Sequence, residues 1–164
     1  MKATHTHACP IAAALNIFGD KWTLLIVREA FYGENRFGDF LKNTGISRNL
    51  LTERLNHLVS HGILARSEFA DRGTKYIYKL TDKGRSLETI LISMVQWGND
   101  HIYEKGAEPM LLWDRRSDSN IAALRPCLQS GEPVAREDLM LVSGPGASRH
   151  VQKRLALAGA QRKQ

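Results

Sequence analysis

The sequence is poor in the residues that mark several common classes of protein. Only two cysteines, Cys9 and Cys127, occur among its 164 residues. They form no C-x-x-C pair, so neither a disulfide framework nor a zinc site made by this chain alone is expected. No stretch approaches the roughly 18–20 apolar residues that a membrane span requires. The N-terminus makes a poor secretory signal, because Asn16 interrupts its short apolar run. We therefore expect a cytoplasmic protein with no membrane partner.

The motifs of the commonest enzyme mechanisms are also missing. The sequence has no G-x-S-x-G element, no glycine-rich phosphate loop and no close pair of metal-ligand motifs. It shows no internal repeat. We therefore expect a protein that is not an enzyme and that binds neither a metal nor a cofactor. A thiol-dependent enzyme that uses Cys9 stays open as a weaker alternative.

What the chain does have is a globular composition with unevenly placed charge. With 43% apolar and 24% charged residues, it can bury a core as one domain with an appendage. Its net charge of +6 is concentrated in two segments. Residues 42–85 carry nine basic and four acidic side chains, and residues 149–164 carry five basic and none acidic. Local positive excess of this kind suits a polyanionic partner such as double-stranded DNA.

Apolar spacing predicts several short helices, then a hairpin, then a long helix. The expected short helices cover residues 11–18, 20–32, 36–44 and 47–61, with Asp20 and Ser47 as N-caps. Residues 64–80 alternate on both sides of the turn sequence ADRGT, which predicts two antiparallel strands. Helical period returns over residues 81–105, with Thr81 as N-cap. The predicted fold is mainly α with a small β-hairpin wing (α+β), a winged helix-turn-helix.

The helix over residues 47–61 has the surface that such a fold would use to read DNA. Leu51, Leu55 and Leu58 share one side of it, and polar side chains spread over the other side. Arg, Asn, Glu and Thr can all contact base edges in the major groove. Arg54 lies nearer the core flank, where it suits a phosphate contact or the packing of its stem. A polar face that is merely solvated is the alternative.

The hairpin adds cations at its predicted tip, where they would meet phosphates. Together with the helix, the candidate DNA-binding residues are Ser47, Arg48, Asn49, Thr52, Glu53, Arg54, Asn56, Arg72 and Lys75.

Short motifs occur in a fixed order along residues 8–104. They are Cys9-Pro10, Gly19 with Lys21-Trp22, Arg36-Phe37 with Asp39, Ile46-Ser47, Leu51-Thr52, Arg54-Leu55, Gly62-Ile63, and Tyr78-Lys79-Leu80-Thr81 with Gly84. In this order and spacing the chain resembles the HxlR-type winged helix-turn-helix transcriptional regulators, which are relatives of the MarR group. The resemblance implies a cytoplasmic, DNA-binding homodimer that acts on promoters.

The resemblance also implies how two protomers would pair, through the first helix and the long last helix. The candidate dimerisation residues are Ile11, Leu15, Leu87, Ile90, Leu91, Met94 and Trp97. For any single one of them, a place in the core of its own protomer is the alternative.

Cys9 is the match to a thiol that senses oxidants or electrophiles in several members of that family. Nearby histidines and a helix N-terminus could lower the pKa of such a thiol. The alternatives are a small apolar residue packed at the dimer interface or, less favoured, a metal site with His5 and His7.

Two segments depart from the family pattern. The wing has Gly73-Thr74-Lys75 where the family usually has a proline and an acidic residue. Longer relatives carry paired cysteines of a zinc ribbon, where this chain has Arg115-Arg116-Ser117-Asp118 and a lone Cys127. We therefore expect a DNA-binding and dimerisation domain over residues 8–104, a ribbon-like appendage without zinc ligands over 105–148, and a basic tail over 149–164 that is a frayed helix or disordered.

The leading functional hypothesis is a homodimeric regulator that binds a pseudo-palindromic promoter site and represses transcription. An oxidant, an electrophile or a small ligand would release it. The alternatives are a nonspecific architectural nucleic-acid-binding protein and the thiol-dependent enzyme. A nonspecific binder would show steep salt dependence with little sequence preference.

Overall fold

The computed structural model describes residues 9–70, 74–121 and 123–161. Its elements in chain order are α1 (Pro10–Phe18), α2 (Thr23–Phe31), α3 (Phe37–Thr44), α4 (Arg48–Ser60), β1 (Leu64–Ala70), β2 (Thr74–Leu80), α5 (Asp82–Arg85), α6 (Glu88–His101), β3 (Trp113–Asp114), β4 (Ser119–Asn120), the 3-10 helix η1 (Arg136–Asp138) and α7 (Arg149–Gln161). The predicted class, mainly helical with a small hairpin wing, is confirmed. The chain divides into two compact units, residues 14–122 and residues 1–13 with 123–164.

The larger unit has one apolar core, to which α2, α3, α4 and the β1–β2 hairpin contribute. Its buried apolar side chains are Ile26, Val27, Phe40, Ile46, Leu51, Leu55, Leu58, Ile63, Leu64, Tyr78 and Leu87. Full burial of one leucine side chain contributes about 1.5–3 kcal/mol. The leucine row of α4 is fully buried, as its i, i+4, i+7 spacing predicts, so the opposite side of α4 faces outward.

A tight turn between α3 and α4 makes the helix-turn-helix. Gly45 has φ = +69° and ends α3 in the left-handed conformation, with its N–H donating to the carbonyl of Leu41 at 3.2 Å. Glycine adopts this conformation without the steric cost of a Cβ atom. Ser47 takes the N-cap position of α4, as predicted, but its side chain makes no capping hydrogen bond.

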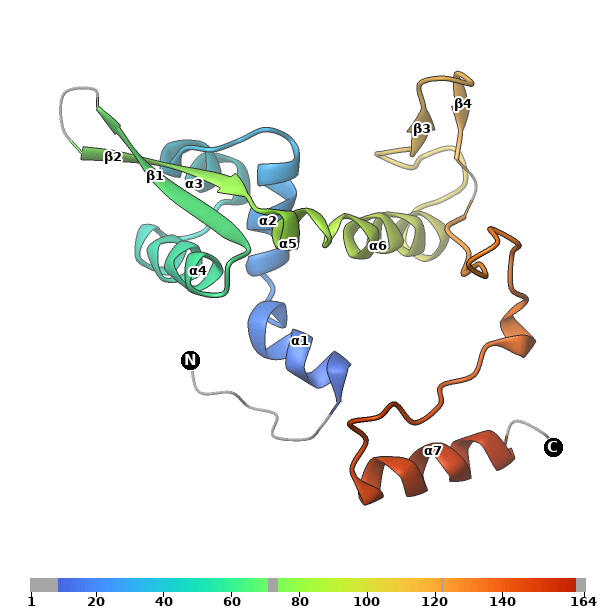
Figure 1. Ribbon diagram of the computed structural model, residues 1–164. Helices are drawn as coiled ribbons and strands as arrows, with labels where there is room; N and C mark the ends of the chain where they lie inside the picture. The colour runs from blue at the N-terminus through green and yellow to red at the C-terminus, as the bar shows by residue number, and fades with distance from the viewer. Residues whose placement is uncertain (1–8, 71–73, 122, 162–164) are drawn as a thin grey trace. The chain divides into compact units, whose positions relative to one another are not determined.

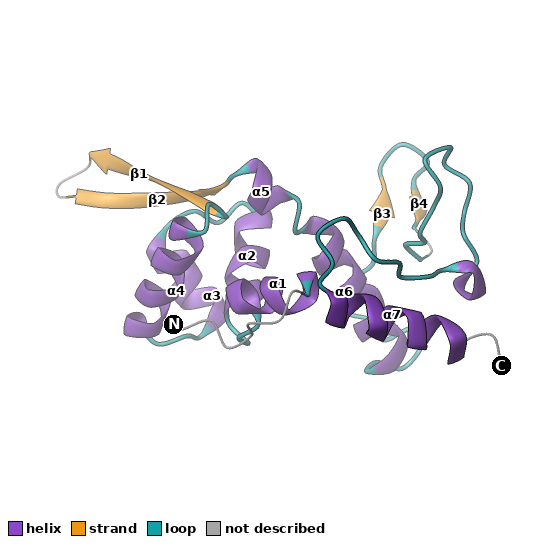
Figure 2. Ribbon diagram, turned by 60° about the horizontal axis from the view of Figure 1, so that its bottom comes forward, coloured by secondary structure: helices purple, strands orange, loops and turns teal. Residues whose placement is uncertain are grey.

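The hairpin pairs β1 with β2 from Leu64↔Leu80 to Ala70↔Thr74. Figures 1 and 2 show it beside α3 and α4. A third short segment, which the sequence did not predict, joins its edge. Arg36 forms an antiparallel bridge with Ile77, and the N–H of Tyr78 donates to the carbonyl of Asn35 at 2.8 Å. These hydrogen bonds fix the wing to the start of α3.

The prediction of a single helix over residues 81–105 is wrong, because the chain turns between α5 and α6. Thr81 caps α5 as predicted, accepting a hydrogen bond from the N–H of Gly84 at 3.0 Å. Gly84 packs so closely on the carbonyl of Ile63 that a Cβ atom would clash with it. Leu87 then turns into the core before α6 begins. The helical periodicity continues through both helices, so it does not reveal the tertiary contacts that separate them.

The two halves of the expected appendage fall in different units. In the larger unit, β3 and β4 pair through Trp113↔Asn120 and Asp114↔Ser119. Asp114 accepts from the N–H groups of Arg116 and Ser117 and from the Ser117 hydroxyl. These hydrogen bonds hold the β3–β4 turn.

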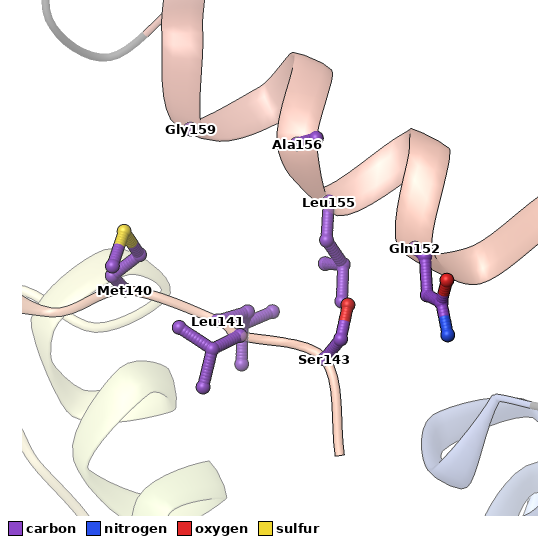
Figure 3. Close-up of a pocket in the computed structure, with 8 residues that line it drawn as sticks. Met140, Leu141, Ser143, Gln152, Leu155, Ala156 and Gly159 are labelled. Atoms are coloured by element: carbon purple, nitrogen blue, oxygen red, sulfur yellow. The ribbon is translucent and has the colours of Figure 1, made fainter. Parts of the chain in front are cut away.

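In the smaller unit, residues 149–161 of the basic tail form the helix α7. This helix, α7, has Val151 and Leu155 half-buried and Lys153 and Arg154 exposed. Figure 3 shows Leu155, Ala156 and Gly159 of α7 facing the segment around Met140 to Ser143, which lines a shallow hollow with them.

No single helix of the described residues is long and apolar enough to cross a membrane. By length and composition, only α1 and α2 taken together would be, and the chain bends by 79° between them.

Candidate nucleic-acid interface

The outward side of α4 gathers most of the predicted DNA-contact residues on one exposed surface. The exposed members are Ser47, Arg48, Asn49, Thr52, Glu53 and Asn56. We call these six residues the reading face. Because the leucines behind it are fully buried, the reading face lies on the side of α4 that points away from the core. A helix of this kind fits the major groove of B-DNA, about 12 Å wide.

Two local contacts order the N-terminal end of the reading face. The guanidinium of Arg48 lies 5.4 Å from the ring centre of Phe37, a cation–π geometry that links it to α3. The hydroxyl of Thr52 donates to the carbonyl of Arg48 at 3.0 Å. An arginine held at the start of a helix is well placed to present its donor pair to guanine.

Arg54 does not belong to the reading face, although the sequence made it a DNA-contact candidate. It is only 9% exposed, and its Nε lies 3.3 Å from Oδ1 of Asp20. Of the two roles that the sequence left open for Arg54, packing at the core flank is the one that the structure has. Its position explains why: Arg54 precedes the buried Leu55 and faces the corner between α1 and α2.

Asp20 organises that corner. Its carboxylate accepts from the N–H of Trp22 at 2.9 Å, from the N–H of Thr23 at 3.1 Å and from the Thr23 hydroxyl. Burial alone would raise the pKa of the Asp20 carboxyl. The hydrogen bonds from Thr23 and Trp22, with the positive charge of Arg54, outweigh burial and hold this pKa below its usual value. The carboxylate is therefore charged at neutral pH. Asp20 is not the N-cap that the sequence predicts, because Trp22 occupies that position and α2 begins at Thr23. Its carboxylate still accepts hydrogen bonds from the first backbone N–H groups at the start of that helix.

The wing meets the reading face through a residue that sequence reasoning missed, Arg66 of β1. Its Nη1 donates to Oδ1 of Asn56 at 3.4 Å, and its guanidinium lies 4.5 Å from the ring centre of Tyr76. The sequence contains one feature that places Arg66 on this side of the strand. Strand alternation places Arg66 on the same side of β1 as the buried Leu64, although Arg66 itself is exposed. Arg66 therefore extends the positive edge of the interface from helix to wing.

The two predicted wing cations are not both within the described residues. Arg72 lies outside them. Lys75 is in β2, opposite Phe69 in the hairpin register.

The predicted dimerisation residues separate into two groups. Leu87 belongs to the core of the protomer, and Leu91 packs against that core. The others are exposed large apolar residues: Ile11, Leu15, Ile90, Met94 and Trp97. On α6 the exposed members, with Ile102 and small residues between them, line an almost wholly apolar hollow. An apolar surface of this kind on a helix is a typical site of protein–protein contact.

The predicted sensor, Cys9, is half-buried and free. It stands directly before α1, and its carbonyl accepts the N–H of Ala13 at 2.9 Å. Cys127 is free and exposed, in a bridge with Pro133. Among the described residues no three His, Cys, Asp or Glu side chains gather as metal ligands would. His5 and His7 lie outside the described residues.

The sequence that forms this fold matches a known protein family. The family model described as HxlR-like helix-turn-helix matches residues 17–106. The chain belongs to the HxlR-like helix-turn-helix family. The match spans the reading face, the wing and the whole of α6. This HxlR-like protein is therefore a helix-turn-helix transcriptional regulator with DNA as its partner.

Relatives and solved structures agree with the family. The HxlR-like chain is 32% identical to the Mycobacterium tuberculosis protein named Uncharacterized HTH-type transcriptional regulator Rv3095, over 83% of this chain and 86% of that one. The crystal structure of PA1607, a candidate transcription factor, superposes with a TM-score of 0.75 at 37% identity, over 85% of this chain and 97% of the other. The redox regulator HypR in its reduced form gives a TM-score of 0.53 at 31% identity, over 57% and 96%.

Proposed function

We propose that this HxlR-like regulator is a cytoplasmic homodimer that binds a pseudo-palindromic promoter site and represses transcription by occupying it. The observation that carries the proposal is the reading face, an exposed row of base-reading side chains on a helix whose other side is fully buried. Two such helices in a dimer would read half-sites one helical turn apart, about 34 Å. Arg66 would contact the adjacent backbone.

The dimer is supported by apolar surface that the protomer leaves exposed. Met94 and Trp97 of α6 are 53% and 61% exposed, and Ile11 and Leu15 of α1 are 67% and 46% exposed. Side chains of this size usually lose water contact in a stable assembly. We propose that α1 and α6 of two protomers bury these surfaces against each other.

Release from DNA would follow modification of Cys9 by an oxidant or electrophile, or the binding of a small ligand between the helices. Cys9 stands at the start of α1, so a change at its thiol would act on a helix that we place in the dimer interface. HypR, a solved relative, is named a redox regulator. A shift in dimer geometry would misplace the paired reading faces.

The test is binding of the reduced and the oxidised protein to its own upstream intergenic DNA and to scrambled DNA at physiological salt. We expect the reduced protein to prefer its upstream DNA by several hundredfold and the oxidised protein to lose this preference. The Cys9→Ser variant should keep the preference under oxidation. A preference that oxidation leaves unchanged in the wild type would remove the thiol switch and retain the regulator.

Arg48 provides the residue-level test. The Arg48→Ala variant should lose discrimination at one base position of each half-site, which corresponds to about 1–3 kcal/mol. Arg85, exposed on α5 and paired with Asp82 at 2.8 Å, supplies the control Arg85→Ala, which should leave discrimination intact. A uniform loss of affinity for all DNA in Arg48→Ala would mean that Arg48 contacts phosphate only.

A second candidate function, nonspecific architectural binding of nucleic acid, has one observation in its favour. Residues 149–164 carry five basic side chains and no acidic one, and Arg149, Lys153 and Arg154 are exposed on α7. Architectural binding predicts nearly equal affinity for upstream and scrambled DNA and a salt slope that falls by about one unit for each phosphate contact removed with this segment. Under the first proposal, truncation after residue 148 leaves the preference for upstream DNA intact.

A further inference from the structure

A directional hydrogen bond joins the C-terminal end of α1 to α4. The Nε2 atom of His57 lies 2.8 Å from the carbonyl oxygen of Ile17, forty residues earlier in the chain. A carbonyl oxygen only accepts hydrogen bonds, so Nε2 carries the proton and donates it. The carbonyl of Ile17 is one of the last four of α1, which find no partner within their own helix. His57 therefore satisfies an otherwise orphaned carbonyl and ties two helices together.

A second polar contact joins α4 to the same corner about one turn away. Arg54 precedes His57 by three residues, so both side chains project from the same side of α4. Arg54 pairs with Asp20 at 3.3 Å, directly after α1. Two successive turns of α4 thus hold the chain that leaves α1. The two contacts, His57 to Ile17 and Arg54 to Asp20, form what we call the corner latch.

The latch differs in kind from the other contacts that hold α4. The leucine row packs into an apolar core, and the attraction between apolar side chains is non-directional. A hydrogen bond at 2.8 Å weakens steeply when its geometry changes. The latch therefore adds two directional contacts to the packing of Ile17 and Phe18 against the same core.

We propose that His57 is a positioning residue that transmits the position of α1 to the reading face. The inference rests on the proposed function, in which α1 carries Cys9 and part of the dimer interface. It adds the route by which a displacement of α1 reaches the DNA-reading helix. In the proposed dimer, α1 lies at the interface between protomers and α4 lies on the DNA. The link through His57 therefore sets the half-site spacing that the dimer binds.

The chain offers a rescue variant and a matched control. His57→Gln keeps an N–H donor close to the position of Nε2, whereas His57→Leu fills a similar volume without a donor. His61 lies at the same end of α4, but its Nδ1 is 2.9 Å from the carbonyl of His57 in its own helix. His61→Leu therefore removes an imidazole that makes no hydrogen bond to α1, and its ring contact with His57, 4.2 Å between centres, is lost in both leucine variants.

The first measurement needs no DNA. Amide hydrogen exchange is followed over residues 51–60 of the full-length protein for all three variants. We expect His57→Leu to exchange about five- to tenfold faster than the wild type there, because one hydrogen bond no longer opposes local opening. His57→Gln and His61→Leu should stay within about twofold of the wild type. Equal exchange in His57→Leu and the wild type would overturn the proposal, as would equal acceleration in His57→Gln.

The second measurement uses DNA selected by the wild-type protein from a random-sequence duplex library, with one base pair then inserted or removed between the half-sites. Each change rotates one half-site by about 35° and shifts it by about 3.4 Å. We expect the wild type and His57→Gln to lose about 30-fold or more in affinity, and His57→Leu to lose about threefold or less. An unchanged spacing preference in His57→Leu overturns the proposal. If the wild type selects no paired half-sites, the proposed function fails, and the exchange measurement alone decides the role of His57.

Discussion

Single residues decide whether a polar group reads DNA or holds the fold, and Arg54 shows how. On a helical wheel it lies between the leucine row and the reading face, so spacing alone leaves both roles open. Arg54 takes the packing role because Asp20, thirty-four residues earlier, places its carboxylate 3.3 Å from Arg54 Nε. A charge at such a depth requires a charged or hydrogen-bonding partner, and the fold provides one. Arg66 shows the opposite case, an exposed arginine that contacts with Asn56 and Tyr76 hold at the edge of the wing.

The pH dependence of stability tests the Asp20 contacts. The folded pKa of Asp20 lies below its usual value of 3.8, so the charged carboxylate stabilises the folded state. This contribution is fully present above about pH 5 and is lost as pH falls below 3.8 and through the folded pKa. Asp20→Asn should therefore lower the free energy of unfolding by about 1–2 kcal/mol at pH 7, and by much less at pH 3.

Urea unfolding at the two pH values measures this difference. Asp82→Asn is the control, because the side chain of Asp82 is fully exposed and should change stability by less than about 0.5 kcal/mol at either pH. An effect of Asp20→Asn that is equal at pH 7 and pH 3 would contradict the charge-based account.

At the scale of elements, the turn before α4 aims the reading face, and its geometry depends on one glycine. Gly45 has φ = +69° with no atom within 4 Å of a would-be Cβ, so any cost of a side chain there comes from the backbone alone. Gly38 also has open space, but it lies inside α3 and has no positive φ. The two positions separate conformational strain from steric clash.

We expect Gly45→Ala to lower the free energy of unfolding by about 1 kcal/mol, since an L-residue resists the left-handed conformation. Gly38→Ala should raise it by about 0.5 kcal/mol, because alanine favours a helix. Thermal unfolding followed by circular dichroism distinguishes the two signs. Destabilisation by both substitutions would mean that α3 does not tolerate a methyl group at Gly38.

The same scale explains why the predicted long helix is two helices. Thr81, Gly84 and Leu87 each satisfy a local rule for a cap, a close approach or a core position. Their combined contacts with Ile63 and the core turn the chain before α6 begins. The result orients α6 so that Met94 and Trp97 lie on its exposed side.

At the scale of the whole molecule, the exposed side of α6 provides the test of the proposed dimer. Met94→Lys places a charge in the apolar hollow. We expect the dissociation constant of the dimer to rise by about 30-fold or more, because an unpaired charge would be buried at the interface. Sedimentation velocity over a range of concentrations measures this change, and circular dichroism checks that the protomer remains folded.

Asp100→Lys is the matched control, since it adds the same lysine to the same helix at an exposed position outside the hollow. It should leave the dissociation constant within about threefold of the wild type. A Met94→Lys protein that dimerises like the wild type would place the interface elsewhere.

The sequence by itself determined the order of elements, the leucine row of α4, the outward polar side and the HxlR-like identity of the chain. These features depend on local periodicity and on short motifs, which residue spacing records directly. The tertiary structure alone decided that Arg54 and Leu87 turn inward, that Arg66 reaches α4, that residues 81–101 form two helices and that α7 is helical. Each of these depends on a partner distant in the chain or on packing against another segment, which residue spacing alone does not identify.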